Sequence, residues 1–122
     1  MIAPAMRLLR PAQVNASSPH TAFSVHAAAY KIAKAAFAQH ETLCRPVGDD
    51  DPLQRAYESA YGPLVDALCQ SAHKVIQTPA ASANELWQKL VIFDAEDMQD
   101  LECAKELIGI LIADALRIGG AA

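Results

Sequence analysis

The chain has 122 residues, of which 52% are hydrophobic and 20% are charged, a balance typical of a folded domain rather than a disordered segment. A chain of this length fits one domain, and its abundant alanine favours helices. The formal net charge of −4 and the lack of a dense basic patch disfavour nucleic-acid binding, which needs several cations to neutralise phosphates.

The first 18 residues are expected to form an extension that is disordered or lies over the body of the protein, with a single domain over residues 19–122. Prolines and arginines interrupt the apolar residues there, so neither a secretory signal nor a membrane span is predicted. The odd set of cysteines, Cys44, Cys69 and Cys103, contains no CxxC pair. Reduced thiols in the cytoplasm explain this pattern more simply than a disulfide framework.

A first helix is predicted from Pro19 to about Cys44, because Ser18 followed by proline is a common start signal. Residues spaced by three and four predict its inward face. That face is expected to comprise Ala29, Ile32, Ala33, Ala36, Phe37, His40 and Leu43. The sequence RPVGDDDP then predicts a turn, since the residue before a proline avoids the helical conformation.

A second helix is predicted from Pro52 to about Gln77, with Asp51 as its N-terminal cap. Gly62-Pro63 lies inside it and predicts a kink, or else a break into two short helices. The apolar stripe keeps its phase across the pair, which favours the kink. The expected inward residues are Leu53, Tyr57, Ala60 or Tyr61, Leu64, Leu68, Ala72 and Val75.

The sequence TPAASANELWQKL, residues 78–90, predicts the joint between two helices. Thr78-Pro79 ends the second helix, and Ser82 with Glu85 forms a capping box in which each side chain bonds the amide of the other residue. A short third helix is expected from Asn84 to Phe93. Its apolar edge is expected to comprise Leu86, Leu90 and Phe93.

A last helix is predicted from Glu96 to Ile118, ending at Gly119-Gly120. Its expected inward stripe comprises Leu101, Ala104, Ile108, Leu111, Ala115 and Ile118. The turn LIGILIA, residues 107–113, has no polar residue and is too short to span a bilayer. We expect it to be buried on all sides, either as the central helix of a bundle or against a second copy of the chain.

Three groups of residues could carry metal or nucleophilic chemistry, each with a plainer structural explanation. His40, Glu41 and Cys44 resemble a metalloprotease helix with cysteine in place of the second histidine, but a partly buried histidine at a helix end is the favoured interpretation. His26 could join Cys69 and His73 in a zinc site if the first two helices pack in a suitable register. Neither metal site is favoured, and no cofactor is predicted.

Asp66, Cys69 and His73 share one stripe of the second helix, yet their order is wrong for a triad because the base must lie between nucleophile and acid. A helix-turn-helix with its turn at Asp94-Ala95 is also disfavoured, because the reading helix would begin with the acidic sequence EDMQDLE.

Two further pairs are interpreted as ordinary structure. Asp114 and Arg117 are expected to form an exposed ion pair, with an anion or partner contact as the alternative. Tyr57 and Tyr61 are expected to be half-buried packing residues rather than a ligand shelf.

A set of short motifs resembles a loose group of small uncharacterised all-helical proteins of alphaproteobacteria, often encoded near prophage or mobile-element genes. The similarity covers roughly Thr21 to Gly119. The motifs are Thr78-Pro79-Ala80, Glu85-Leu86, Lys89-Leu90 and Asp114-Ala115-Leu116-Arg117. The resemblance implies a bacterial or phage cytoplasmic origin and transfers no catalytic residue. The N-terminal extension and Gly62-Pro63 depart from the pattern of the group.

The sequence therefore predicts an all-α domain, an irregular antiparallel bundle of four helices. The leading hypothesis for function is a non-enzymatic protein-interaction module without membrane contact, able to form a homodimer, with a phage-derived regulator or inhibitor of a host system as its most specific form. Its predicted interaction residues are Leu107, Ile110, Ile112 and Leu116. A small metal-dependent or cysteine hydrolase and a DNA-binding regulator remain the alternatives.

Overall fold

The structure, a computed structural model, describes residues 21–42 and 52–120, and these residues form four α-helices. The helices are α1 (Ala22–Glu41), α2 (Pro52–Gln77), α3 (Ala83–Ala95) and α4 (Ala104–Gly120), with the 3-10 turn η1 (Met98–Asp100) between the last two. Of the described residues 87% are helical and none is in a strand, so the predicted irregular antiparallel helical bundle is confirmed.

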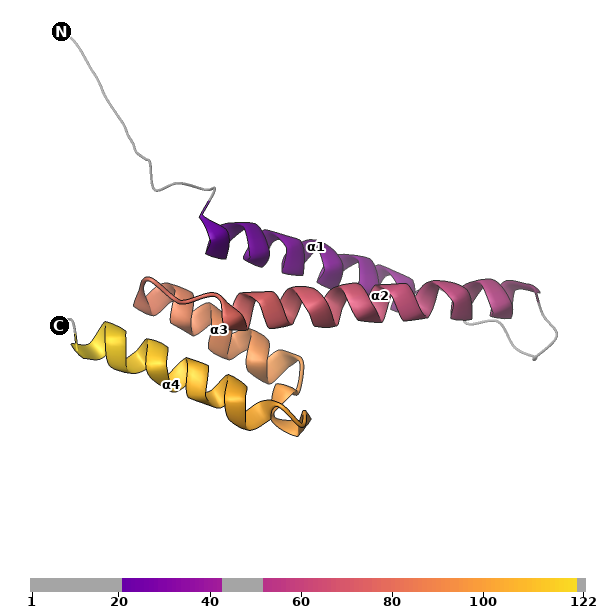
Figure 1. Cartoon of the computed structure of the whole chain (residues 1–122). Helices are drawn as coiled ribbons and strands as arrows, with labels where there is room; N and C mark the ends of the chain where they lie inside the picture. The colour runs from indigo at the N-terminus through magenta and orange to yellow at the C-terminus, as the bar shows by residue number, and fades with distance from the viewer. Residues whose placement is uncertain (1–20, 43–51, 121–122) are drawn as a thin grey trace, which may run out of the picture.

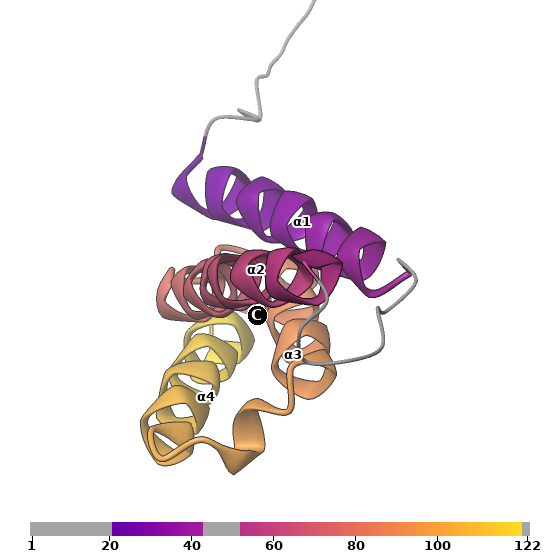
Figure 2. The ribbon, with the colours of Figure 1, turned by 90° about the vertical axis from the view of Figure 1, so that its right-hand side faces the viewer.

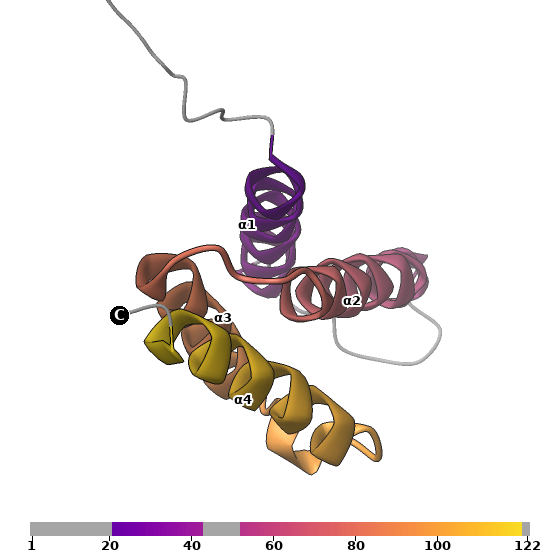
Figure 3. The same cartoon turned by 60° about the vertical axis from the view of Figure 1, so that its left-hand side comes forward.

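Helix α2 is the centre of the arrangement, because it packs against all three other helices. Figure 1 shows that each helix runs opposite to the one before it in the chain. Viewed along α2, α1 lies on one side and the pair α3–α4 lies on the other (Figure 2). Helices α3 and α4 lie side by side, joined through η1 (Figure 3). The expectation that the last helix is the central one is therefore wrong.

Helix α1 begins three residues later than the sequence predicts. Thr21 is its N-terminal cap: the backbone there is extended, and the Thr21 hydroxyl accepts a hydrogen bond of 3.1 Å from the amide of Ser24. This bond satisfies one of the unpaired amides of the first turn. The predicted cap Ser18 and the extension of residues 1–18 lie outside the described residues, as do Leu43, Cys44 and Asp51.

Helix α2 runs through Gly62 and Pro63 without interruption, so two separate short helices do not form. Proline removes one backbone donor, and its ring also crowds the β-carbon of the residue before it. Gly62 has no β-carbon, which relieves that second clash and permits the helical conformation. A bend at this point stays a prediction.

The start of α3 confirms the capping box with one correction. The Ser82 hydroxyl accepts from the amide of Glu85 at 3.2 Å, as predicted. The Glu85 carboxylate, however, accepts from the amide of Ala81 at 2.8 Å rather than from that of Ser82. The capping box therefore includes Ala81, the residue before the cap. At its other end, α3 extends two residues further than expected, to Ala95.

The last helix begins at Ala104 rather than Glu96, because the chain turns at Asp97. This residue has φ 50°, a left-handed conformation that ends a right-handed helix. Glu96 instead ends α3, and its carboxylate accepts hydrogen bonds of 2.6 Å from both Tyr30 and Lys34 of α1. The acidic segment therefore forms a turn, and the reading helix of a helix-turn-helix does not exist.

The core lies where α2 meets its three neighbours, and it differs in part from the predicted stripes. Its buried members are Phe23, Ala27, Tyr30, Leu68, Ala72, Val75, Ile76, Ile92, Met98 and Leu107. In α1, Ala29 and Ile32 face solvent, while Phe23 and Tyr30 are buried. Leu101 lies after η1, before α4 begins, and is exposed; in α4, Ile108 and Ala115 are exposed, whereas Leu107 and Leu111 are buried.

These errors share one cause. Helices α1 and α4 are apolar on more than one face, so periodicity alone cannot select the face that packs. In α2 the second half of the stripe is correct, with Leu68, Ala72 and Val75 buried, but Leu53 and Tyr61 are exposed beyond the reach of α3 and α4. None of the described helices is both long and apolar enough to cross a membrane.

Replacing Ser82 by alanine is expected to lower the free energy of unfolding by about 1 kcal/mol, because it removes the capping acceptor of α3. Urea unfolding followed by circular dichroism measures this change. Ser59→Ala is the matched control, since Ser59 is exposed in the middle of α2 and caps no helix. Equal stability of the two variants would contradict the capping role.

Candidate functional site

A buried ion pair joins α3 to α4, and the sequence does not indicate it. The side chain of Lys89 has no exposed surface and that of Asp114 is 2% exposed. The Lys89 ammonium donates to one carboxylate oxygen of Asp114 and, at 2.8 Å, to the carbonyl of Thr78. Burial of charge is tolerated here because each ion is paired and hydrogen-bonded.

The other carboxylate oxygen of Asp114 holds the segment that enters α3. It accepts from the amide of Ala80 at 3.2 Å and from the Arg117 guanidinium at 2.7 Å. Arg117 also donates to the carbonyl of Ala80 at 2.6 Å. The predicted exposed pair of Asp114 and Arg117 is therefore wrong: the carboxylate is buried, and only the arginine, at 51%, reaches solvent.

The protonation of Asp114 follows from these contacts. Burial by itself raises the pKa of a carboxyl group, but hydrogen bonds from Lys89, Arg117 and the Ala80 amide outweigh it and lower the pKa of Asp114 below its ordinary value. The aspartate is thus held ionised. The network joins α3, α4 and the segment of residues 78–82, and both oxygen atoms of the Asp114 carboxylate accept hydrogen bonds within it.

His40 is buried at the end of α1, and its ring stacks on Tyr57 of α2 with centroids 4.2 Å apart. The neighbouring Glu41 carboxylate accepts a hydrogen bond of 3.0 Å from the Tyr57 hydroxyl. Tyr61 contacts Phe37, with ring centroids 5.8 Å apart, so both tyrosines act as packing residues. Cys44, the second predicted ligand, lies outside the described residues, so the metal site with His40 stays untested.

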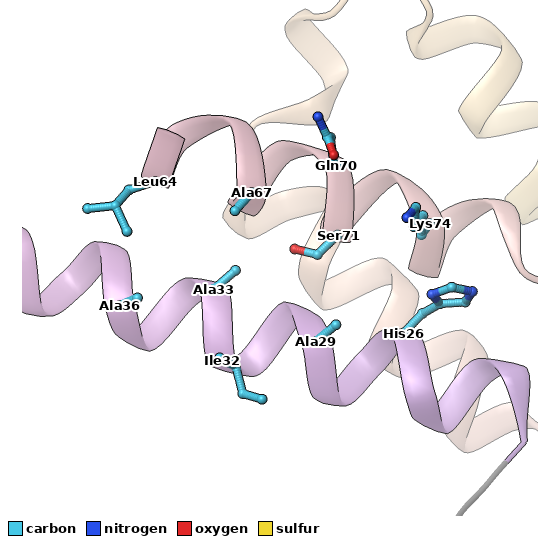
Figure 4. A pocket seen from close by; sticks show the side chains of 10 residues that line it. All are labelled: His26, Ala29, Ile32, Ala33, Ala36, Leu64, Ala67, Gln70, Ser71 and Lys74. Atoms are coloured by element: carbon cyan, nitrogen blue, oxygen red, sulfur yellow. The ribbon is translucent and has the colours of Figure 1, made fainter. Parts of the chain in front are cut away.

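The structure separates His26 from the two residues predicted to share zinc with it. His26 lies at the end of a groove between α1 and α2, beside Lys74 (Figure 4). His73 lies near the start of α4, where its Nε2 is 3.6 Å from the sulfur of Cys103. No group of three potential metal ligands occurs within the described parts of the chain, so a site joining His26, Cys69 and His73 does not form.

The predicted stripe of Asp66, Cys69 and His73 does not form a triad either. His73 Nδ1 is 3.0 Å from the backbone carbonyl of Cys69, and that carbonyl can only accept. In a neutral imidazole the proton therefore sits on Nδ1, and Nε2 presents its lone pair to the Cys103 thiol. His73 thus contacts Cys103, which lies 30 positions further along the chain and was not suggested by the spacing of residues within the second helix.

Figure 4 shows the groove between α1 and α2, which encloses about 480 Å³. Four of the ten lining residues are alanine and four are polar, and Ile32 on α1 and Leu64 on α2 are the larger apolar residues. Small side chains on both helices leave this space open. Alanine methyl groups offer little apolar area, so burying them yields a small gain in free energy.

A second hollow, between α3 and α4, has larger aliphatic walls. Its lining is entirely apolar and comprises Leu86, Leu90, Phe93, Ile108, Leu111, Ile112 and Ala115. Within this lining Ile112 is 54% exposed, and Leu116, which lies beside the hollow on α4, is 71% exposed. We call these eight residues the α3–α4 surface. Each partly exposed leucine or isoleucine contributes up to about 1–2 kcal/mol when a partner covers it.

The predicted interaction residues divide between this surface and the core. Ile112 and Leu116 lie on the α3–α4 surface. Leu107 is 2% exposed and belongs to the core, and Ile110 is a partly buried residue packed against it. The segment of residues 107–113 is therefore not buried on all sides within one chain. The α3 residues Leu86 and Leu90, predicted to form the apolar edge of that helix, complete the surface.

No protein-family model matches the chain, and no curated protein or solved structure is detectably similar to it. Five residues of the short sequence motifs considered above lie close together in the structure. Thr78, Ala80, Lys89, Asp114 and Arg117 all take part in the buried ion network.

Replacing Lys89 by methionine is expected to lower the free energy of unfolding by about 3–5 kcal/mol, because Asp114 is left buried without its main partner. Urea unfolding measures the loss, and Lys31→Met, at an exposed lysine of α1, is the control. The double variant Lys89→Met/Asp114→Leu should lose less than the sum of the two single changes. Additive losses would contradict direct coupling.

The network also predicts an acid dependence of stability. Because the folded-state pKa of Asp114 is lowered, its contribution is complete above the unfolded aspartate pKa of about 3.9 and is lost as the pH falls through the folded-state value. The difference in stability between the wild type and Asp114→Asn should therefore be largest near pH 6 and shrink below about pH 3.9. A difference that is constant with pH would show that the carboxylate charge does not contribute.

Proposed function

We propose that the protein is a non-enzymatic interaction module that binds a helical protein partner through the α3–α4 surface. The observation that carries this proposal is the outward face of α4 between Ile108 and Leu116, which is exposed and bears no charged residue. Water-exposed helix faces are normally polar, and contiguous apolar patches of a few hundred Å² mark interaction sites.

The shape of the surface supports a helical partner. The hollow between α3 and α4 is an elongated seam between two antiparallel helices, and such seams receive the apolar face of a third helix, whose side chains recur at spacings of three and four. The buried network of Lys89 and Asp114 holds α3 and α4 together beneath it. A partner therefore meets a preformed surface, which lowers the entropic cost of binding.

A phage-derived regulator or inhibitor of a host system is the more specific form of this proposal, and action in the cytoplasm accompanies it. Both rest on the resemblance to proteins encoded near prophage genes. A partner that offers an apolar helix is compatible with that role.

Thiol chemistry is a second candidate function, favoured by the approach of Cys103 to His73. A base that faces a thiol can accept its proton when the sulfur attacks an electrophile. If this pair is functional, His73→Ala should slow alkylation of Cys103 by iodoacetamide at least tenfold and leave that of the exposed Cys69 unchanged. Equal rates in the two proteins would remove this candidate.

Site-specific photocrosslinking tests the interaction proposal. A photoreactive amino acid at Ile112, introduced in the cells that naturally make the protein, should yield a covalent adduct with the partner. The same amino acid at Val25 is the matched control, because Val25 is 51% exposed on α1 and is not part of the α3–α4 surface. Absence of any adduct from Ile112, or equal adducts from both positions, would contradict the proposed surface.

A further inference from the structure

The exposed ridge of α4 has a charge pattern of its own. Its residues recur at spacings of three and four and are all exposed: Lys105, Gly109, Ile112, Leu116 and Gly120. The cation stands at the N-terminal end of the ridge, and the other four residues carry no charge. The opposite end coincides with the C-terminus of α4, which is the negative end of the helix dipole.

Resting on the function proposed above, we infer that the partner of the α3–α4 surface is a second copy of this chain, with the two α4 helices packed antiparallel about a two-fold axis at Ile112. A two-fold interface uses the same patch on both copies, so the patch must be complementary to itself. The ridge meets that condition because its two ends carry opposite charge and its middle is apolar.

The register follows from the position of the axis. With Ile112 opposite its own counterpart, each Ile108 lies against Leu116 of the second copy, so the apolar residues face one another. Each Lys105 then lies beside the C-terminal end of the other α4, around Gly119. A cation at that end of a helix is favourable, and the symmetry provides the contact twice.

The charged residues beside the ridge, Glu106 and Arg117, independently indicate the same register of the two α4 helices. Glu106 and Arg117 are 11 residues apart, which is close to three helical turns, so they lie on one side of α4. A two-fold axis at Ile112 brings Glu106 of one copy opposite Arg117 of the other, to within one residue. Arg117 is half exposed and holds Asp114 and Ala80 through one of its nitrogen atoms, which leaves donors for a second carboxylate.

A parallel arrangement lacks these advantages. It would place Lys105 beside the Lys105 of the second copy and align the two helix dipoles in the same direction. The charge pattern therefore selects the antiparallel pair.

The composition of the surface matches the usual anatomy of a dimer interface. A specific interface buries about 800 Å² on each partner, roughly a tenth of the surface of a small protein. One copy exposes 7549 Å² in total. The residues of the α3–α4 surface, with Gly109 and Ala113 beside them, supply an apolar centre, and Lys105, Glu106 and Arg117 supply a polar rim, which is the usual anatomy of an interface.

The net charge of the chain gives a further distinction. Two copies, each with a formal charge of −4, repel one another at long range, and salt screens that repulsion. Salt also screens the favourable contacts of Lys105, Glu106 and Arg117, so the dissociation constant of a homodimer should change little as salt increases. Binding to a basic partner would instead weaken as salt increases.

The first experiment measures mass across a dilution series by light scattering and sedimentation. The wild type should be a dimer that dissociates on dilution, and Ile112→Glu should raise the dissociation constant at least tenfold with an unchanged helical spectrum. Lys105→Glu should raise it by roughly 3- to 30-fold, as expected for the loss of two cation–dipole contacts. Val25→Glu should behave as the wild type.

The second experiment tests the register by oxidation of single cysteines, in a chain whose Cys44, Cys69 and Cys103 are replaced by serine. Ile112→Cys should form a disulfide-linked dimer. Ile108→Cys and Leu116→Cys should link to each other in a mixture but not to themselves. Self-linking of Ile108→Cys would overturn the antiparallel pair, and a dimer unaffected by Ile112→Glu would overturn the surface.

The adduct from photoreactive Ile112 separates this inference from the function on which it rests. An adduct with twice the mass of the chain supports the second copy. An adduct with a different protein, together with a monomer at all concentrations, overturns the homodimer and leaves the interaction module intact. A monomer without any adduct overturns both.

Discussion

The ion pair between Lys89 and Asp114 is the constraint on which the second half of the molecule depends. Two charges without contact with water are stable only while they remain together, because separating them leaves an unpaired ion in the core. The pair therefore fixes the register of α3 against α4. Through Thr78 and Ala80 it also fixes the path of the chain between α2 and α3. Hydrophobic packing alone tolerates sliding of helices more readily than this geometry does.

The buried ion pair determines which residues of α4 face solvent. With Asp114 turned inward, Leu107 and Leu111 share its side of α4, and Ile108, Ile112 and Leu116 turn toward solvent. A helix with a buried carboxylate thus carries aliphatic residues on its outer face. The inversion of the usual pattern is the physical basis for assigning an interaction role to α4. The groove between α1 and α2, although larger, is lined by alanine and polar residues with only two larger aliphatic side chains (Figure 4).

Among the residues that the structure describes, the histidines lie apart from one another. His40 stacks on Tyr57, His26 lies beside Lys74, and His73 faces Cys103, so three histidines occupy three separate surroundings. The structure thereby replaces the partners that sequence spacing suggested for His73.

The sequence by itself determined the all-helical class, the number of helices, the bounds of α2 and the cap at Ser82, because these depend on local signals: helix propensity, prolines and side chains that reach the nearest amides. Tertiary structure alone decided which face of α1 and α4 is buried, where α4 begins and that Lys89 meets Asp114. Alanine- and isoleucine-rich helices offer several equivalent apolar faces, and the choice among them depends on contacts between residues 25 positions apart in the chain.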